Sequence, residues 1–171
     1  MSSVSHPGML ARYTAWANAR LYESLARESN AVLSMDRPGR QGGILGVLGH
    51  IHVVSLIWKA HLTGRAHGFT TRRLADPVPL AELRERQSQV DDWYVAFAES
   101  RTTDGLAKDV RFLFVDGSAG AMTVEDMLLH VVNHSTYHRG YVADMLYDSG
   151  SAPPTMDLPV YVREVRARGH A

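Results

Sequence analysis

Four long segments of this chain repeat apolar residues at the three- and four-residue spacing of an α-helix, and this periodicity limits its possible folds more than any other feature. The segments cover residues 8–29, 43–64, 80–100 and 123–149. Helices with one apolar face are stable in water mainly when those faces pack against one another. The pattern therefore predicts an all-α protein in which four long helices form a four-helix bundle.

The segment before the fourth helix breaks the helical pattern. Apolar residues alternate at Val110, Phe112 and Phe114, ahead of an Asp-Gly pair, which predicts a short hairpin or an extended crossover. Thr123, followed three residues later by Asp126, has the spacing of a capping box and predicts the start of the fourth helix. The proline-rich tail predicts a turn and then a short C-terminal helix.

Composition narrows the class of protein. With 171 residues and no repeat or linker, the chain is expected to form a single domain over residues 1–171. Eighteen basic residues balance eighteen acidic ones, which argues against nucleic acid or an anionic membrane as a partner. We find no apolar run of transmembrane length and no signal peptide in MSSVSHPG, so the expected location is the cytoplasm. Cysteine is absent, which excludes thiolate metal sites, whereas histidine occurs nine times.

Three of the histidines lie on one face of the fourth predicted helix. At about 100° per residue, His130 and His138 fall roughly 40° to either side of His134, and Arg139 points away from them. The face of the histidines also holds Met127, Val131, Tyr141 and Met145. Residues four apart have Cβ atoms about 5–6 Å from each other, so that two imidazoles can bind one ion. The spacing predicts a metal site inside the bundle.

The other ligands have to come from a second helix. A lone buried histidine is more often a hydrogen-bonded core residue than a ligand, and a metal needs more than two protein ligands. The second helix offers His50, His52 and His61. His52 lies about 200° from His50 and faces another way, while His61 lies about 16 Å further along the axis. Helical periodicity leaves the choice between His50 and His61 open.

Four stretches of the sequence resemble one known family. They are YTAWANARLYESLA, LGHIHVVSLIWKAHLTG, LLHVVNHSTYHRG and GSAPPTMDLPVYV. With these motifs, which span nearly the whole chain, it resembles the DinB/YfiT-like family of metal-dependent four-helix-bundle proteins. The resemblance implies that His50, His134 and His138 are the metal ligands. It implies also that His130 lies beside the metal without binding it.

The chain departs from the pattern of that family at two positions near the last ligand. Tyr137 stands where the family often has histidine, and Tyr141 stands where it often has glutamine. Neither change removes a ligand. Tyr141 faces the site by its helical angle, so we expect it in the pocket, where it affects what binds.

A site of three histidines leaves one or more coordination positions for water, which is the open arrangement of a catalytic metal site. We expect one divalent metal ion per chain, with zinc first and nickel, iron, manganese or copper as alternatives. Protons should displace the ion as the pH falls toward the ordinary histidine pKa of about 6.5. No catalytic side chain is assigned.

Some proteins of the wider superfamily resemble thiol-dependent transferases or isomerases. The resemblance therefore implies a metal-dependent enzyme of the thiol-dependent transferase or hydrolase type, with a low-molecular-weight thiol and an electrophile as substrates. The alternative is a metal-binding, stress-associated protein without turnover that acts through its dimer or a partner. The absence of an acid/base carboxylate from the helix-four motif supports this alternative.

Further residues have structural interpretations. Arg139 is expected in a surface salt bridge, and the alternative that the resemblance implies is that it binds an acid across a helix or subunit contact. Asn18 is expected at the cap of a loop, and Trp16 in the core. Three glycines of the second helix, Gly43, Gly46 and Gly49, are expected to permit close helix packing.

Aromatic residues of the first and fourth helices are too many for all of them to face the core. They are Tyr13, Trp16, Tyr22, Tyr137 and Tyr147. Exposed aromatic surface is typical of an interface centre, and the family that the chain resembles commonly forms two-fold dimers. We therefore expect a homodimer that does not depend on the metal, with a monomer as the alternative.

Overall fold

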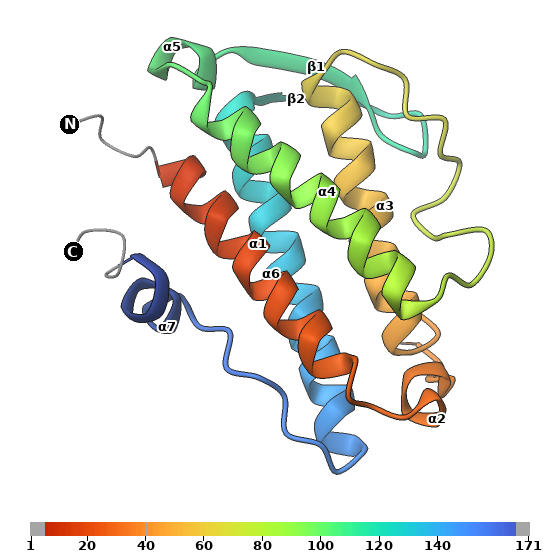
Figure 1. The fold of residues 1–171 in the computed structure, drawn as a ribbon. Coiled ribbons are helices and arrows are strands. Elements are labelled where there is room, and N and C mark those ends of the chain that lie inside the picture. Colours follow the sequence, from red (N-terminus) through yellow and green to blue (C-terminus); the bar gives the residue numbers. More distant parts are fainter. Residues whose placement is uncertain (1–5, 40, 167–171) are drawn as a thin grey trace.

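Four long helices make up most of the fold in the computed structural model, which describes residues 6–39 and 41–166 (Figure 1). They are α1 (His6–Leu25), α3 (Ile44–Leu62), α4 (Leu80–Glu99) and α6 (Val124–Asp148). Shorter helices are α2 (Asn30–Ser34), α5 (Thr103–Leu106) and α7 (Leu158–Tyr161), and a π-helical segment, Val162–Arg166, follows α7. The predictions of a mostly helical chain and of a short C-terminal helix are confirmed.

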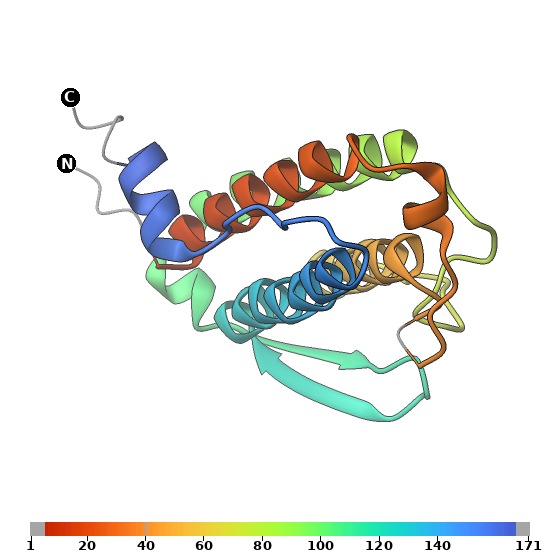
Figure 2. The same ribbon diagram turned by 90° about the horizontal axis from the view of Figure 1, so that it is seen from below.

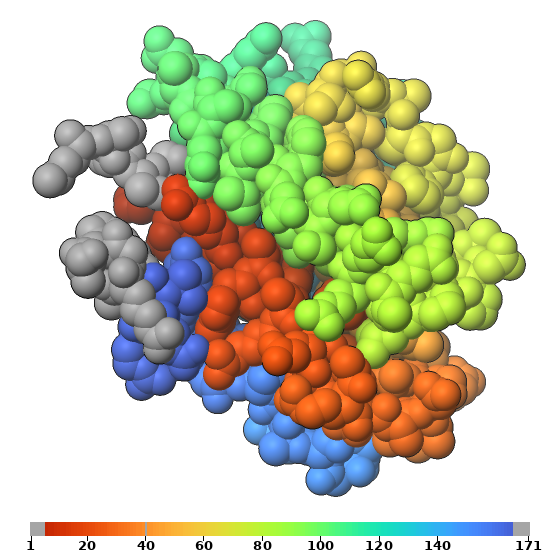
Figure 3. All heavy atoms as spheres, in the orientation of Figure 1, coloured from red at the N-terminus to blue at the C-terminus, as the bar shows by residue number. Residues whose placement is uncertain are grey.

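The long helices lie in two layers. α1 packs against α4 in one layer and α3 against α6 in the other, and the layers meet through α1 with α6 and α3 with α4. Figure 2 shows both layers from below, with the hairpin on the outer side of α3 and α6. In the space-filling view, α1 and α4 form the centre of the front face (Figure 3). The histidines of α3 and α6 therefore belong to the layer behind.

A two-stranded hairpin leads directly into α6. Strands β1 (Asp109–Leu113) and β2 (Ala119–Thr123) pair antiparallel, and Gly117 adopts a φ of 84° in the turn between them. Thr123 and Asp126 close the first turn of α6 with a reciprocal capping box. The predicted hairpin and capping box are both confirmed, and together they fix where the helix with three histidines begins.

The glycines at the start of α3 allow other segments to approach closely. A Cβ atom on Gly46 would lie 1.9 Å from the carbonyl oxygen of Gln41, and one on Gly49 would lie 2.9 Å from the Leu74 side chain. Gly43 has a φ of 110°, which strains any other residue. The close packing expected of these glycines is present, but their partners are loop residues rather than another helix.

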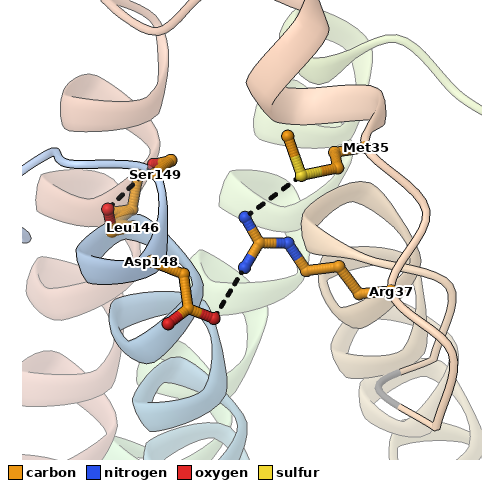
Figure 4. A network of polar contacts seen from close by, with 5 residues as sticks. All are labelled: Met35, Arg37, Leu146, Asp148 and Ser149. Atoms are coloured by element: carbon orange, nitrogen blue, oxygen red, sulfur yellow. Dashed lines mark hydrogen bonds and ion pairs between the residues drawn. The ribbon is translucent and has the colours of Figure 1, made fainter.

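Arg37 attaches the loop before α3 to the end of α6. Its guanidinium lies 3.1 Å from the Asp148 carboxylate and 3.6 Å from the Met35 sulfur (Figure 4). In the same view, the Ser149 hydroxyl donates to the Leu146 carbonyl at the end of α6. The loop that Arg37 fixes continues to Gln41, which lies beside the histidines.

The core contains three apolar clusters, and a polar layer separates the two larger ones. One cluster contains Trp58, Tyr94, Phe112 and Met127, and the other contains Leu21, Ile44, Leu83 and Met145. The buried polar side chains between them are Asn18, His50, His52, Gln87, Asp91, Ser135, His138 and Arg139. Every long helix contributes to this layer.

Within the described residues, α3 is the only helix long and apolar enough to cross a membrane. This corrects the expectation that no apolar run reaches that length. However, 78% of the apolar window of α3 is buried inside the fold. α3 thus has the burial of a core helix, which is consistent with a soluble protein.

Candidate metal centre

Three histidines from two helices converge in the polar layer. His50 lies near the middle of α3, and His134 and His138 lie on successive turns of α6. Each offers one ring nitrogen, and these three nitrogens lie within 4.8 Å of one another. In residues 6–39 and 41–166, no other group of three histidine or carboxylate side chains comes together in this way. The structure therefore brings together the three residues that the resemblance implied.

A main-chain hydrogen bond orients the ring of His50. Its Nδ1 atom lies 2.8 Å from the carbonyl oxygen of Arg72, which can only accept, so Nδ1 carries the proton and donates. The lone pair of His50 is therefore on Nε2, which faces Nε2 of His134 at 3.1 Å. A backbone carbonyl that fixes the second ring nitrogen is the usual partner of a metal-binding histidine.

The donor set fits a single divalent ion. Two nitrogens bound to one zinc ion at about 2.0–2.1 Å lie roughly 2.9–3.4 Å apart, for angles between 90° and tetrahedral. The 3.1 Å between the Nε2 atoms of His50 and His134 lies in this range. Nδ1 of His138 is buried without a hydrogen-bond partner. Such an orphaned ring nitrogen is costly in a protein interior, and a metal near it would offset the cost.

Burial keeps the imidazoles neutral. Desolvation, followed by repulsion from neighbouring histidines, lowers the pKa of His134 to about 3 and that of His138 to about 4. Desolvation also lowers the pKa of His50, with smaller effects from the charges of Arg72 and Arg73. Neutral imidazole is the form that binds metal. The proton competition expected near pH 6.5 therefore moves to lower pH.

The lowered pKa values predict acid sensitivity of the metal-free protein. Between about pH 6.5 and pH 4, these histidines take up protons in the unfolded chain but stay neutral in the folded site. The unfolded state then binds more protons, so stability falls as the pH falls. Each extra proton lowers the free energy of unfolding by about 1.4 kcal/mol per pH unit. Denaturant titrations at about pH 6 and pH 5 measure this slope.

The His134→Gln variant is the matched comparison, because glutamine does not titrate. The free energy of unfolding of this variant should depend less steeply on pH, by the contribution of about one proton. Burial raises the pKa of Asp91 to about 6, so the protonation of Asp91 makes the free energy of unfolding rise as the pH falls. This contribution is the same in both proteins and cancels in the comparison. Equal slopes for the two proteins would show that His134 titrates normally in the folded state.

The histidine centre opens into a cleft of about 920 Å³. Its floor comes from α3 and α6, where the rings of Trp58 and His130 lie 4.6 Å apart. One wall is the connection between α3 and α4, with Arg72 and Arg73, and the other is the turn of the hairpin, with Phe114. The cleft gives the centre access to a small molecule.

The remaining candidate residues lie at different distances from the centre. His130 is half-buried in the cleft, with its ring 5.8 Å from that of His134. Tyr141 lies with its ring 5.6 Å from that of His138, and its hydroxyl contacts that of Tyr137. Both rings lie beside the centre, but of the two only His130 lines the cleft.

The two other histidines of α3 are not part of the centre. His52 faces away from it and approaches Gln87, with Nδ1 3.2 Å from the amide oxygen. The ring of His61 lines the outer cleft and lies 4.9 Å from that of Phe112. The geometry thus agrees with His50 as the third member of the cluster.

A buried chain of hydrogen bonds crosses the fold at the level of the histidines and joins all four long helices. Arg139 of α6 donates to Asn18 of α1, whose amide donates to Asp91 of α4, both at 2.9 Å. Gln87 donates to the second oxygen of Asp91 at 2.8 Å and bonds His52 of α3 through its own oxygen. All five side chains are buried.

This buried chain corrects two predictions. Arg139 does not form a surface salt bridge: it is 2% exposed, and its guanidinium also lies 5.5 Å from the centre of the Tyr13 ring. Asn18 does not cap a loop but connects Arg139 to Asp91. No motif in the sequence marks Asp91 as part of this network, and Arg72 lies in a polar connection without periodicity.

The comparisons with known proteins agree with one another. The family model described as "DinB family" matches residues 1–167. The chain is also similar to "Protein DinB" of Bacillus subtilis (strain 168), with 25% identity over an alignment that covers 90% of this chain and 91% of that protein. The match to the family model includes all three converging histidines.

Proposed function

The chain belongs to the DinB family, and from this premise we propose that it is a metal-dependent enzyme in which His50, His134 and His138 hold one divalent ion. The observation that carries the proposal is the convergence of their three ring nitrogens within 4.8 Å. The proposal includes a four-helix bundle as the architecture, a single domain over residues 1–171, and a cytoplasmic location.

Zinc is the ion that we propose first. Neutral imidazole nitrogens suit it, and three protein ligands leave a position for water or substrate. Nickel, iron and manganese also bind imidazole, so geometry alone does not select among them. Metal analysis of the purified protein, without added metal, identifies the ion.

The proposed reaction is the transfer of a low-molecular-weight thiol to an electrophile. A bound divalent cation would supply Lewis acidity that lowers the pKa of a thiol or water beside it. His50, held by the Arg72 carbonyl, orients the centre. Trp58 in the floor and Phe114 in the hairpin turn would provide apolar surface beside the reacting atoms. In the overall reaction, the sulfur loses its proton, bonds the electrophilic carbon, and displaces a leaving group with its electron pair.

Turnover of glutathione with a chlorodinitrobenzene-type electrophile tests this function. We expect a rate that disappears with chelator, returns with zinc, and is absent from a His138→Gln variant in either condition. Unchanged turnover after complete metal removal would rule out a metal-dependent enzyme. Metal binding without turnover of any thiol and electrophile pair would favour the second candidate.

The second candidate is a metal-binding, stress-associated protein without turnover. One observation favours it: among the described residues that line the cleft, the only carboxylate is that of Asp116 in the hairpin turn. This side chain is exposed and accepts two hydrogen bonds from Ser118. No carboxylate stands beside the histidines as a general base, so any proton transfer would have to use solvent or an imidazole.

We also propose a homodimer that forms independently of the metal. Tyr13 and Tyr22 are buried inside the fold and are unavailable for an interface, but Tyr137 and Tyr147 of α6 are 61% and 68% exposed. Such exposed aromatic side chains are favoured in interfaces. Light scattering at micromolar concentration should give twice the chain mass of 18.9 kDa with and without chelator. The mass of a single chain in both conditions would contradict the dimer.

A further inference from the structure

We propose that the cleft takes an anionic substrate, whose carboxylate or phosphate group binds Arg72 and Arg73 while its reacting atom lies at the histidine centre. This inference rests on the proposed function and names the class of substrate for the same site. It arises from residues of the connection between α3 and α4, which no helical motif includes.

The position of Arg72 is fixed relative to the centre by the main chain. Its carbonyl oxygen accepts the hydrogen bond from Nδ1 of His50 at 2.8 Å. The same residue therefore orients a candidate ligand and presents a guanidinium to the cleft. Arg73 follows directly and lines the cleft as well. Both charges are close enough to lower the pKa of His50.

The cleft has an excess of positive charge. Of the described residues that line it, two are arginines and one, Asp116, is an acid. Asp116 already accepts hydrogen bonds from the amide and hydroxyl of Ser118, and it lies near enough to Arg72 for that charge to lower its pKa. A divalent ion would add to the positive field.

The two guanidinium groups have unused hydrogen-bonding capacity. Within the described part of the chain, the side chains of Arg72 and Arg73 form no hydrogen bond and no ion pair, although other exposed arginines, such as Arg12 with Glu99, do. Guanidinium groups bind carboxylate and phosphate through paired charge-assisted hydrogen bonds. Two adjacent arginines that line a cleft are therefore suited to an anionic oxygen group.

The opposite wall defines the rest of the substrate. Trp58 is buried in the floor, and Phe114 of the hairpin turn is 44% exposed, so the cleft offers apolar surface as well as the two arginines. A matching substrate has an acidic group at one end, a short apolar spacer, and a thiol or electrophile at the other.

Calorimetric titration of the zinc-loaded protein with 3-mercaptopropionate and 2-mercaptoethanol tests the proposal. These thiols are of similar length, but only the first carries a carboxylate. We expect the wild-type chain to bind 3-mercaptopropionate about 10–100-fold more tightly, which is the range for charge-assisted hydrogen bonds. The Arg72→Gln/Arg73→Gln double variant should lose most of this preference. Its zinc content and its Kd for 2-mercaptoethanol should stay unchanged.

Arg65→Gln is the matched control. Arg65 is exposed in the same connection but does not line the cleft, so its replacement should leave the preference intact. Because both thiols are compared on every protein, differences in their own acidity cancel. Equal affinities in the wild-type chain, or a preference retained by the double variant, would overturn the proposal.

Two further measurements keep the test decisive if the double variant loses zinc. Higher ionic strength should weaken binding of 3-mercaptopropionate to the wild-type chain and leave 2-mercaptoethanol unaffected. Acetate and inorganic phosphate, used as competitors, tell a carboxylate site from a phosphate site. Competition by neither anion, or affinities that do not respond to salt, would count against the inference.

Failure of this inference is distinguishable from failure of the proposed function. Zinc binding without any charge preference would refute the anionic substrate and leave the metal site intact. If the wild-type chain binds no zinc, succinate is titrated into the metal-free protein and the side-chain NMR signals of Arg72 and Arg73 are followed. Saturable shifts that vanish in the double variant would then support the anion site alone, and their absence would refute it.

Discussion

Replacing His50, His134 or His138 with alanine is expected to remove most of the bound metal. Each residue supplies one of three nitrogens that lie within 4.8 Å, so each variant leaves only two protein ligands. Loss of a residue that merely orients a ligand typically costs 10–100-fold in affinity, and loss of a ligand should cost more than 100-fold. Metal content after dialysis, together with titration calorimetry, measures the effect.

Controls come from the same helices. His52→Ala and His61→Ala should retain the metal, because His52 faces Gln87 and His61 lies by Phe112 in the outer cleft. His130→Ala should fall between the two groups, since His130 packs beside His134 without joining the cluster. Full metal retention by His50→Ala would refute the proposed ligand set.

Replacing Arg139 with methionine is expected to lower the free energy of unfolding by about 3–5 kcal/mol, the usual cost of breaking a buried charged network. The change removes the positive charge that acts on buried Asp91, and it leaves the amide oxygen of Asn18 without its donor. A charge left alone in the interior is not screened by water. Urea denaturation followed by circular dichroism measures the loss.

Arg12→Gln provides the comparison on α1. Arg12 pairs with Glu99 on the surface, where both side chains are at least 40% exposed, so the loss should be within about 1 kcal/mol. Asp91→Leu combined with Arg139→Met should cost less than the sum of the single changes, because removing both charges leaves neither unpaired. A cost for Arg139→Met as small as that for Arg12→Gln would show that the buried network contributes little.

The helices could be predicted from sequence because their apolar positions repeat over many turns. Segments 43–64 and 80–100 are observed as Ile44–Leu62 and Leu80–Glu99. The first segment was predicted too long. Residues 8–29 include both the end of α1 at Leu25 and a break before α2, where the Ser29 side chain caps a separate short helix. Periodicity persists through such a break, so it does not reveal one.

The site was predictable where its residues share a helix. His134 and His138 follow from their four-residue spacing, but helical angles left His50 and His61 as equal candidates. Choosing between them required the resemblance to a family, because the relative height of two packed helices is a tertiary property. In the structure, His50 is at the level of the pair.

The positions of Arg139, Arg72 and Arg73 were not predicted, because they depend on tertiary packing. Arg139 was assigned to the surface because it points away from the histidines, but α6 is contacted on one side by α3 and on another by α1. Facing away from the site therefore means facing α1, where Asn18 receives the guanidinium. Arg72 and Arg73 escaped notice because irregular connections have no periodicity from which their positions could be calculated.

The division of the cleft between helices and loops bears on how such proteins diverge. The histidines stand on α3 and α6, whose packing tolerates little change, whereas the arginines and Phe114 stand on a connection and a hairpin turn. Mutations in these surface segments leave the core undisturbed and accumulate readily. After gene duplication, a daughter protein can thus inherit the three-histidine cluster intact while the residues that surround the cleft change. Grafting the connection between α3 and α4 from one relative onto another would be the corresponding route for engineering.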